Sequence, residues 1–205
     1  STTMANMGII YTSSPVFIVI LSVFLFSEKI SLNRIVGLII CLIGVITIIT
    51  KGNFNYLINF SFTTGDFWML GAAIGWALYS IYLLNWKSKF SLMGRFTLIA
   101  FFGFISLFPF YILEESLFFD TKFNSTFLAW VLFAAISPGI IAFSLYTKVQ
   151  RYLGASLTGF TLYLFAVYGA IFGIILFEEM LLPFHYYGGA LVFAGVYIAR
   201  KIKTI

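Results

Sequence analysis

Charged residues are scarce in this chain. They make up 9% of its 205 residues, whereas apolar residues make up 61% and the mean hydropathy is +1.04. A soluble domain typically has about 25% charged residues, so this chain has too few of them to cover a surface that faces water. The composition therefore excludes a soluble globular domain and predicts a protein whose outer surface contacts lipid.

Cysteine and histidine occur only once each, as Cys41 and His185. One residue of each kind cannot build a disulfide or a structural zinc site within the chain. The sequence also lacks a cluster of carboxylates or a Ser/His pair inside any apolar run, so it offers no catalytic constellation. We therefore expect no enzymatic activity, no metal and no cofactor.

Basic residues outnumber acidic residues by twelve to seven, but they form no cluster. Because they are scattered between apolar runs, we interpret them as topology determinants and do not expect nucleic acid as a partner. The opening residues STTMANMG lack a basic segment followed by an apolar run, so we do not expect a signal peptide here.

Seven apolar segments are long enough to cross a bilayer. The hydrocarbon core is about 30 Å thick, and an α-helix needs about 20 residues to span it. Since no soluble domain or low-complexity tract interrupts the series, the sequence predicts one all-α, polytopic membrane domain. The expected spans are residues 8–26, 35–50, 67–84, 96–113, 127–147, 155–177 and 184–199.

Positive charges divide unevenly between the two ends of these spans. Ten fall on one side, and only Lys51 and Lys122 fall on the other. Because positively charged loops stay in the cytoplasm, we expect a cytoplasmic C-terminus and Ser1 on the outer side of an inner or plasma membrane. The ten are Lys29, Arg34, Lys87, Lys89, Arg95, Lys148, Arg151, Arg200, Lys201 and Lys203.

The stretch Pro15–Val45 recurs near the C-terminus. Glu28 falls on Glu179, and the difference between these numbers, 151 residues, aligns the two stretches without gaps. Apolar matches arise easily in such a chain, but a lone Glu followed nine and sixteen residues later by Gly is not an effect of composition. The matched glycines are Gly8 with Gly159, Gly37 with Gly188, and Gly44 with Gly195.

The two copies have opposite orientations, because five expected spans separate Glu28 from Glu179 and an odd number of crossings reverses the chain. This pattern is typical of inverted-repeat transporters, in which substrate binds near the midplane between two halves. We expect residues 1–51 to be the end of a first repeat, with two helices, and residues 66–203 to be a complete second repeat, with five. A complete first repeat would need three more spans, in roughly 85 to 90 residues before Ser1.

Three stretches of the chain resemble the EamA-type transporters of the drug/metabolite transporter superfamily. SPVFIVILSVFLFSEKISLNRIVGLIICLIGVITI and LYLFAVYGAIFGIILFEEMLLPFHYYGGALVFAGVYIA look like the fourth-to-fifth and ninth-to-tenth spans of that family. GDFWMLGAAIGWALYSIYL is similar to its sixth span. The resemblance covers nearly the whole chain and implies a ten-helix fold of two inverted five-helix halves (5+5), with both termini in the cytoplasm. It favours export over uptake and implies no particular substrate.

Two departures from the family pattern stand out. At the offset of 151 residues Ala166 corresponds to Pro15, and the family often has Pro at this position. The first three spans of the family have no counterpart here, so we do not expect a chain of this length to transport by itself.

Glu28 and Glu179 lie at the ends of expected spans. Either they take part in gating or coupling, or they complete a hinge by accepting backbone N–H groups at the start of the next helix, where the helix dipole favours negative charge. We favour the hinge cap, because functional charges in membranes usually lie nearer the midplane. No carboxylate lies at mid-span, which favours a facilitator or exchanger over a proton-coupled transporter.

Polar and aromatic groups near mid-depth are the candidates for lining a substrate pocket. Trp76 and Tyr79 share a helix face, and Pro138-Gly139 can interrupt a span and free backbone carbonyls that only protein or a water-lined cavity satisfies. The alternative for each residue is ordinary helix packing or contact with lipid. The substrate-lining candidates are Trp76, Tyr79, Ser137, Pro138, Tyr163 and Tyr168.

Other polar and small residues have simpler interpretations. Gly71-x3-Gly75 and Gly169-x3-Gly173 are expected to let helices approach closely. Lys148, Gln150 and Arg151 are expected to form a solvated turn, and His185 to lie at the membrane interface.

The sequence as a whole predicts a membrane transporter that works by alternating access. Aromatic lining without buried charge favours amino acids or other amphipathic metabolites and drugs as substrates. The expected partners are this small-molecule substrate and the lipid bilayer, and a homodimer stays open. The alternatives are a non-transporting membrane scaffold and a seven-helix receptor-like protein. A retinal protein is disfavoured because residues 184–199 contain no Lys.

Overall fold

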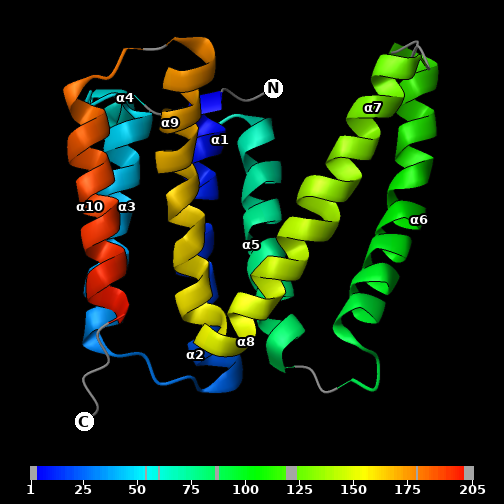
Figure 1. Cartoon of the computed structure of the whole chain (residues 1–205), viewed down its shortest axis with the longest axis horizontal. Helices are drawn as coiled ribbons and strands as arrows, with labels where there is room; N and C mark the ends of the chain where they lie inside the picture. Colours follow the sequence, from blue (N-terminus) through cyan, green and yellow to red (C-terminus); the bar gives the residue numbers. More distant parts are fainter. Residues whose placement is uncertain are drawn as a thin grey trace. The chain divides into compact units, whose positions relative to one another are not determined.

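The computed structural model of the chain (Figure 1) describes residues 4–53, 55–59, 61–85, 88–118, 124–178 and 180–200. Every regular element in these ranges is helical, so the expected all-α fold is confirmed. The α-helices are α1 (Met4–Tyr11), α2 (Ser14–Phe26), α3 (Leu32–Ile49), α4 (Asn55–Ile58), α5 (Thr64–Asn85), α6 (Leu92–Phe118), α7 (Ser125–Ala134), α8 (Phe143–Gly159), α9 (Leu164–Phe177) and α10 (Pro183–Arg200). A π-helix, η1 (Ala135–Ala142), precedes α8, and a 3₁₀-helix, η2 (Phe160–Tyr163), precedes α9.

Five stretches within the described ranges are helical, long and apolar enough to cross a membrane: Asn6–Phe26, Leu32–Ile49, Thr64–Asn85, Gly94–Glu114 and Ser125–Leu176. The chain is therefore a multi-pass membrane protein, but the expected count of seven spans is not confirmed.

The difference between five and seven has two physical causes. Ser125–Leu176 is one run of 52 residues, which contains two of the expected spans. An unbroken helix of that length would rise about 78 Å, more than twice the thickness of the hydrocarbon core. The helix is in fact broken at Gly154, whose φ of 81° and ψ of 167° are not helical. The other missing span is α10, which is long enough but begins with the less hydrophobic residues PFHYYGG.

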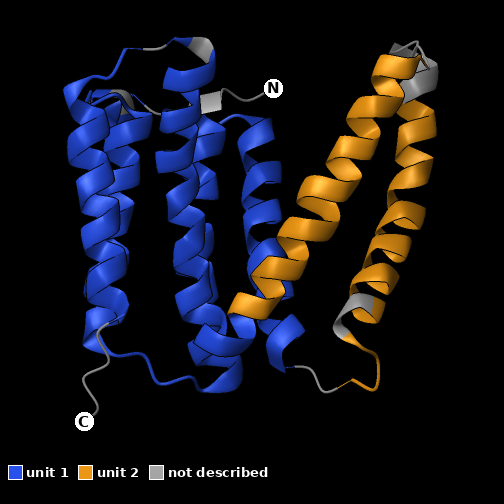
Figure 2. Cartoon of the chain, viewed as in Figure 1, with its two compact units in different colours: residues 1–85, 150–205 blue, residues 86–149 orange. Residues whose placement is uncertain are grey.

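The chain forms two compact units (Figure 2). Unit 1 comprises residues 1–85 and 150–205, and unit 2 comprises residues 86–149. Unit 1 contains both copies of the repeated stretch. Unit 2 contains α6, α7, η1 and the first part of α8. The repeats at 1–51 and 66–203 are predicted from similarity within the sequence, whereas the two units are defined by compactness. The division into repeats therefore stays a prediction.

The backbone of unit 1 repeats with the same offset of 151 residues as the sequence. α3 covers Leu32–Ile49 and α10 covers Pro183–Arg200, so both ends of these helices match. α2 ends at Phe26 and α9 at Phe177, and each is followed by a non-glycine residue in the left-handed region, Ser27 with φ 52° and Glu178 with φ 55°. The two stretches therefore adopt the same local structure as well as sharing a sequence pattern.

The matched glycines bring α3 and α10 into direct backbone contact. A Cβ built on Gly37 would lie 2.5 Å from the carbonyl oxygen of Gly195, and one built on Gly44 would lie 2.7 Å from that of Gly188. Since Gly188 matches Gly37 and Gly195 matches Gly44, each contact exchanges the roles of the two copies, as in a two-fold interface. The residue numbers run in opposite directions along the pair, so the helices are antiparallel.

Cys41 marks the centre of this interface. Its thiol donates to the carbonyl oxygen of Val192 at 3.4 Å, and Val192 is its own match at the offset of 151. A residue that contacts its own counterpart lies on the two-fold axis. Small residues around such an axis let two helices pack at the shortest distance.

Two clusters of buried apolar residues stabilise unit 1. The first surrounds the α3–α10 pair and includes Phe160 and Tyr163 of η2. The second joins Ile18 of α2 to Ala77 and Ile81 of α5 and to Ala155 of α8. The sequence-predicted close packing at Gly71, Gly75 and Gly169 is not found, because no described atom lies within 4 Å of a Cβ built there.

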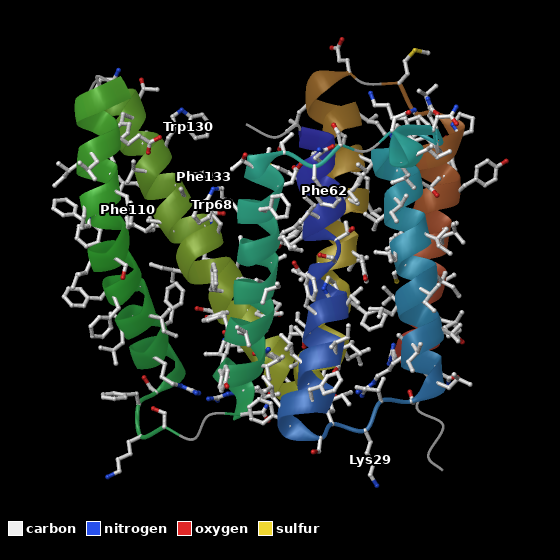
Figure 3. The ribbon with its side chains drawn as sticks, turned by 180° about the vertical axis from the view of Figure 1, so that it is seen from behind. Lys29, Phe62, Trp68, Phe110, Trp130 and Phe133 are labelled. Atoms are coloured by element: carbon white, nitrogen blue, oxygen red, sulfur yellow. The ribbon has the colours of Figure 1, made fainter. Side chains whose placement is uncertain are left out.

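Large apolar side chains cover the outside of the helices (Figure 3). In unit 2, Phe110, Trp130 and Phe133 are 70%, 67% and 59% exposed. In unit 1, Trp68 is 79% exposed. Exposing so many large apolar side chains to water would be unfavourable. They fit the lipid-facing surface expected from the composition.

Most of the described basic residues of unit 1 lie at one end of its helices. We call it the hinge end: α2 ends and α3 begins there, and α5 and α10 also end there (Figure 1). Lys29 points away from the helices at this end (Figure 3). Arg34 and Arg200 lie in the first turn of α3 and at the last residue of α10, whereas Lys51 follows the opposite end of α3. The described part of unit 1 thus has an uneven charge distribution of the kind the sequence predicts.

Candidate functional site

The first apolar stretch is interrupted near its middle. α1 ends at Tyr11 and α2 begins at Ser14, with Pro15 in the first turn of α2, where its missing N–H is tolerated. The hydroxyls of Thr12 and Ser13 donate to the carbonyl oxygens of Ile9 and Ile10 at 2.6 and 2.5 Å. Thr12 and Ser13 therefore bond to backbone carbonyls next to the break.

The second copy has an interruption at the corresponding place. η2 covers Phe160–Tyr163, and α9 starts at Leu164. Here Ala166 stands in place of the proline, so a change to 3₁₀ hydrogen bonding replaces the proline break. Thr161 donates to the carbonyl oxygen of Thr158 at 2.7 Å. Each copy thus has a discontinuous helix, the feature that typically forms the binding sites of inverted-repeat transporters.

The two interruptions lie against each other in unit 1. A Cβ built on Gly159 would lie 3.6 Å from Cα of Pro15, and the rings of Tyr11 and Phe165 have centroids 6.4 Å apart. The contact therefore joins the end of α1 and the start of α2 to the start of α9.

Two buried hydroxyls at these interruptions have no hydrogen-bond partner among the described residues. They belong to Ser14, next to Pro15, and to Tyr163, the last residue of η2, and both side chains are 0% exposed. A buried polar group without a partner costs about 1–3 kcal/mol, so such groups persist where a ligand or water takes up the hydrogen bond. Ser14 and Tyr163 are therefore the polar groups of the candidate site.

The aromatic pair predicted from the sequence lies on α5 of unit 1. The rings of Trp76 and Tyr79 on α5 have centroids 5.5 Å apart. Trp76 packs against the cluster around Ile18 and Ala77, together with Tyr11. The apolar faces of these rings can hold the apolar part of an amphipathic ligand, and they attract a cationic group.

The other predicted lining residues lie on α9 and in unit 2. Tyr168 on α9 is 51% exposed. Ser137 and Pro138 lie in unit 2, within the π-helix η1. The π-helix agrees with the expectation that Pro138-Gly139 disturbs the span, since π-turns form where the regular α-helical ladder cannot continue. Which of the predicted residues touch substrate stays a prediction.

Glu28 has other partners than the backbone donors expected of a hinge cap. One carboxylate oxygen accepts from the Arg34 guanidinium at 2.9 Å, and the other accepts from the hydroxyl of Ser156 at 2.9 Å. The start of α3 is capped by Ser31, whose hydroxyl accepts from the backbone N–H of Arg34. Ser31 therefore supplies the cap expected of Glu28, and Glu28 connects side chains. Glu179, the second predicted cap, lies outside the described residues.

Gln150 is not the solvated side chain that the sequence suggested. It is 1% exposed, and its amide nitrogen donates to the carbonyl oxygen of Ser80 on α5 at 2.6 Å. Its neighbour Arg151 is exposed, as expected. Helical periodicity explains the difference, because adjacent residues on α8 point to different faces.

The geometry of two matched hairpins with discontinuous helices agrees with what sequence comparison finds. A profile of the EamA-like transporter family matches residues 1–50 and 63–200. The chain belongs to this family. The resemblance that the hairpin motifs indicated is therefore confirmed.

Two curated relatives have similar sequences. An uncharacterized transporter of Methanothermobacter thermautotrophicus is 27% identical over 200 residues, which cover 96% of this chain and 57% of the relative. The uncharacterized transporter YetK of Bacillus subtilis is 26% identical over 197 residues, which cover 96% of this chain and 60% of YetK. This EamA-like chain thus spans about three-fifths of the length of the curated relatives it matches.

One solved crystal structure has a similar fold. Its TM-score is 0.75 at 20% identity, and the match covers 97% of this chain and 68% of the other. At that identity the likeness shows the shared fold alone.

Sequence reasoning found Tyr163 but missed Ser14 and Ser156. Ser14 could have been found, because TSSP is the most polar tetrapeptide inside the first apolar run of this EamA-like transporter. Ser156 could not, because its contact with Glu28 joins positions 128 residues apart that no repeat relates.

Proposed function

We propose that this EamA-like transporter exports small amphipathic metabolites, such as amino acids or drugs, by alternating access. The observation that carries the proposal is the pair of matched helix interruptions in unit 1, with the buried, unpartnered hydroxyls of Ser14 and Tyr163. Discontinuous helices in two oppositely oriented repeats are the usual place for a transported substrate.

The chemistry of the site supports this class of substrate. Ser14 and Tyr163 can each donate or accept a hydrogen bond. Trp76 and Tyr79 offer aromatic faces, which bind apolar groups and ammonium groups. None of these four side chains carries a formal charge, so the site favours a neutral or zwitterionic molecule over a strongly anionic one.

The architecture belongs to the same proposal. The antiparallel, two-fold contact of α3 with α10 supports two inverted halves, and the break at Gly154 supports two separate spans within Ser125–Leu176. Seven spans here, within a ten-helix 5+5 transporter, follow from that interpretation. The basic residues at the hinge end support a cytoplasmic position for the hinge end and for the C-terminus, in an inner or plasma membrane.

Flux into liposomes tests the proposal directly. The protein expressed from the full natural reading frame is reconstituted, and uptake and counterflow of a panel of labelled amino acids and lipophilic amines are measured. Saturable flux of at least one compound is expected. Absence of saturable flux over the whole panel would overturn the proposal.

A matched pair of variants links any such flux to the site. Ser14→Ala removes a hydroxyl without a protein partner and should raise the KM for substrate about fivefold to tenfold, since one hydrogen bond to a ligand contributes about 1 kcal/mol. Ser13→Ala is the control, because the hydroxyl of Ser13 already donates to the carbonyl oxygen of Ile10. Equal KM values for the two variants would exclude Ser14 from the site.

A further inference from the structure

Glu28 bonds to both copies of the repeat at once. It lies in the hinge loop, residues 27–31, between α2 and α3. Its carboxylate holds Arg34 of the first copy through Oε1 and Ser156 of the second copy through Oε2, each at 2.9 Å. Each oxygen therefore has one charge-assisted partner, and such bonds are stronger than neutral ones.

The hydroxyl of Ser156 has no counterpart in the first copy. The residue that matches Ser156 at the offset of 151 is Ala5, which has no hydroxyl. The residue that matches Arg34 is His185, whose Nδ1 accepts from the backbone N–H of Leu182 at 3.1 Å. The two partners of Glu28 are thus not repeated in the sequence, although the surrounding hairpins match.

The segment that carries Ser156 begins at a point where the backbone can pivot. Gly154 has φ 81° and ψ 167°, and no described atom lies within 4 Å of a Cβ built there. Residues that absorb large backbone changes at the ends of helices are the usual hinges of domain motion. Ser156 itself is 0% exposed, so in this structure the segment is held against the first copy.

Buried polar groups lie directly behind this contact. The carbonyl oxygen of Ser22 on α2 accepts from the backbone N–H of Glu28 at 3.2 Å, and the side chain of Ser22 is 2% exposed. Ser22 shares a helix face with Ile18, which belongs to the same buried cluster as Ala155 of the segment that carries Ser156. We expect movement of the segment away from α2 to raise the exposure of Ser22, and this expectation is what the labelling experiment measures.

We infer that Glu28 and Ser156 form a latch that keeps the hinge end of unit 1 closed, and that it opens once in each transport cycle. This structure has the latch closed. The role in transport rests on the function proposed above. The latch itself is a conformational equilibrium that can be measured without any substrate.

Thiol labelling at Ser22 measures that equilibrium. Ser22→Cys is introduced into the protein from the full natural reading frame, which is placed in lipid nanodiscs and treated with a membrane-impermeant maleimide. Cys41, the one cysteine among these 205 residues, is 0% exposed, and the same protein without the Ser22→Cys change gives the background rate. Slow labelling of Ser22→Cys is expected while the latch is intact.

Breaking the latch should raise the labelling rate. Ser156→Ala in the Ser22→Cys background removes one hydroxyl and leaves the ion pair of Glu28 with Arg34. We expect labelling to become about tenfold faster. Loss of a hydrogen bond to a charged group raises the population of the open latch by about that factor. Glu28→Gln should have an effect at least as large, and Ser156→Thr, which restores a hydroxyl, should return the rate toward the slow value.

The control variant is Glu178→Gln, which removes an exposed carboxylate at the other end of the second copy's hairpin. It should leave the labelling rate unchanged. An unchanged labelling rate in Ser156→Ala would overturn the latch. Equal acceleration by Ser156→Ala and Glu178→Gln would also overturn it, because it would indicate a general loosening of the protein. If Glu28→Gln does not fold, Ser156→Ala alone decides. Because labelling needs no substrate, failure of the latch and failure of transport are separate results.

Discussion

Gly37 and Gly195 touch through their backbones. A Cβ on Gly37 would lie 2.5 Å from the carbonyl oxygen of Gly195, and a Cβ on Gly195 would lie 2.6 Å from that of Gly37. Real Cβ atoms do not approach an oxygen so closely, so neither position accepts a side chain unless α3 and α10 separate. This pair fixes the distance between the last helices of the two copies, and several predictions about the fold depend on it.

Adjacent glycines on α10 give the sharpest test of this contact. A Cβ on Gly188 would lie 2.7 Å from the carbonyl oxygen of Gly44, whereas no described atom lies within 4 Å of a Cβ on Gly189. Gly188→Ala should destabilise the protein by about 1–3 kcal/mol or more through overpacking. Gly189→Ala should be neutral or stabilising by up to about 1 kcal/mol, since alanine favours the helix. Thermal unfolding in detergent, followed by size-exclusion chromatography, measures both; equal midpoints would contradict the close contact.

The thiol of Cys41 reports on the same interface. Because it is 0% exposed and donates to the carbonyl oxygen of Val192, it should react with maleimide at least about tenfold more slowly in the folded protein than after denaturation. Gly188→Ala should speed the reaction in the folded protein by forcing the helices apart, and Gly189→Ala should not. Fast labelling of the unmodified protein in nanodiscs would mean that α3 and α10 separate readily.

The cap of α3 is testable by a single hydroxyl. Ser31→Ala removes the side chain that accepts from the backbone N–H of Arg34 and should cost about 0.5–1 kcal/mol of stability. Ser27→Ala is a suitable control, since Ser27 belongs to the same loop but follows the end of α2. Chemical unfolding monitored by circular dichroism measures the difference. If Ser31→Ala is as stable as Ser27→Ala, Ser31 does not cap α3, and Glu28 is again the candidate for the cap.

Asp66 stabilises the start of α5 and should not tolerate truncation. It is 0% exposed, and its Oδ2 accepts from the side chain of Asn6 at 3.1 Å and from the backbone N–H and hydroxyl of Thr63 at 2.7 and 3.0 Å. Asp66→Ala leaves these donors without their acceptor and should cost about 2–4 kcal/mol. Asp66→Asn keeps one acceptor oxygen and should cost less. The same thermal assay checks the order, with the exposed Glu114→Gln as a neutral control.

Much of the architecture could be predicted from the sequence, because it depends on patterns that the chain carries locally. Apolar runs between polar loops predict helices and a lipid-facing surface. The offset between Glu28 and Glu179 predicts which helix ends correspond, and α3 and α10 match at both ends. The glycines spaced nine and sixteen residues after each Glu mark the repeat in the sequence, and the structure shows that α3 and α10 approach most closely at them.

Other features could not be predicted, because they depend on which helix faces become neighbours. Gly71-x3-Gly75 has the same small-residue pattern as a packing site, yet a Cβ at either position meets no described atom. Gln150 lies between two basic residues and is nevertheless buried against Ser80. The spacing of residues along one helix fixes a face but does not specify its partner.

The sequence by itself determined the class of this protein: a helical membrane protein of two related hairpins in opposite orientations, with a charge asymmetry that favours one topology. Composition and periodicity are sufficient for this, since lipid requires every backbone group to be satisfied within helices. The tertiary structure alone decided where the polar groups meet. It buried the hydroxyls of Ser14 and Tyr163 at the two interruptions and brought Ser156 to Glu28 across 128 residues. Such contacts follow from the packing of whole helices, which depends on all of their faces together and not on any one stretch of residues.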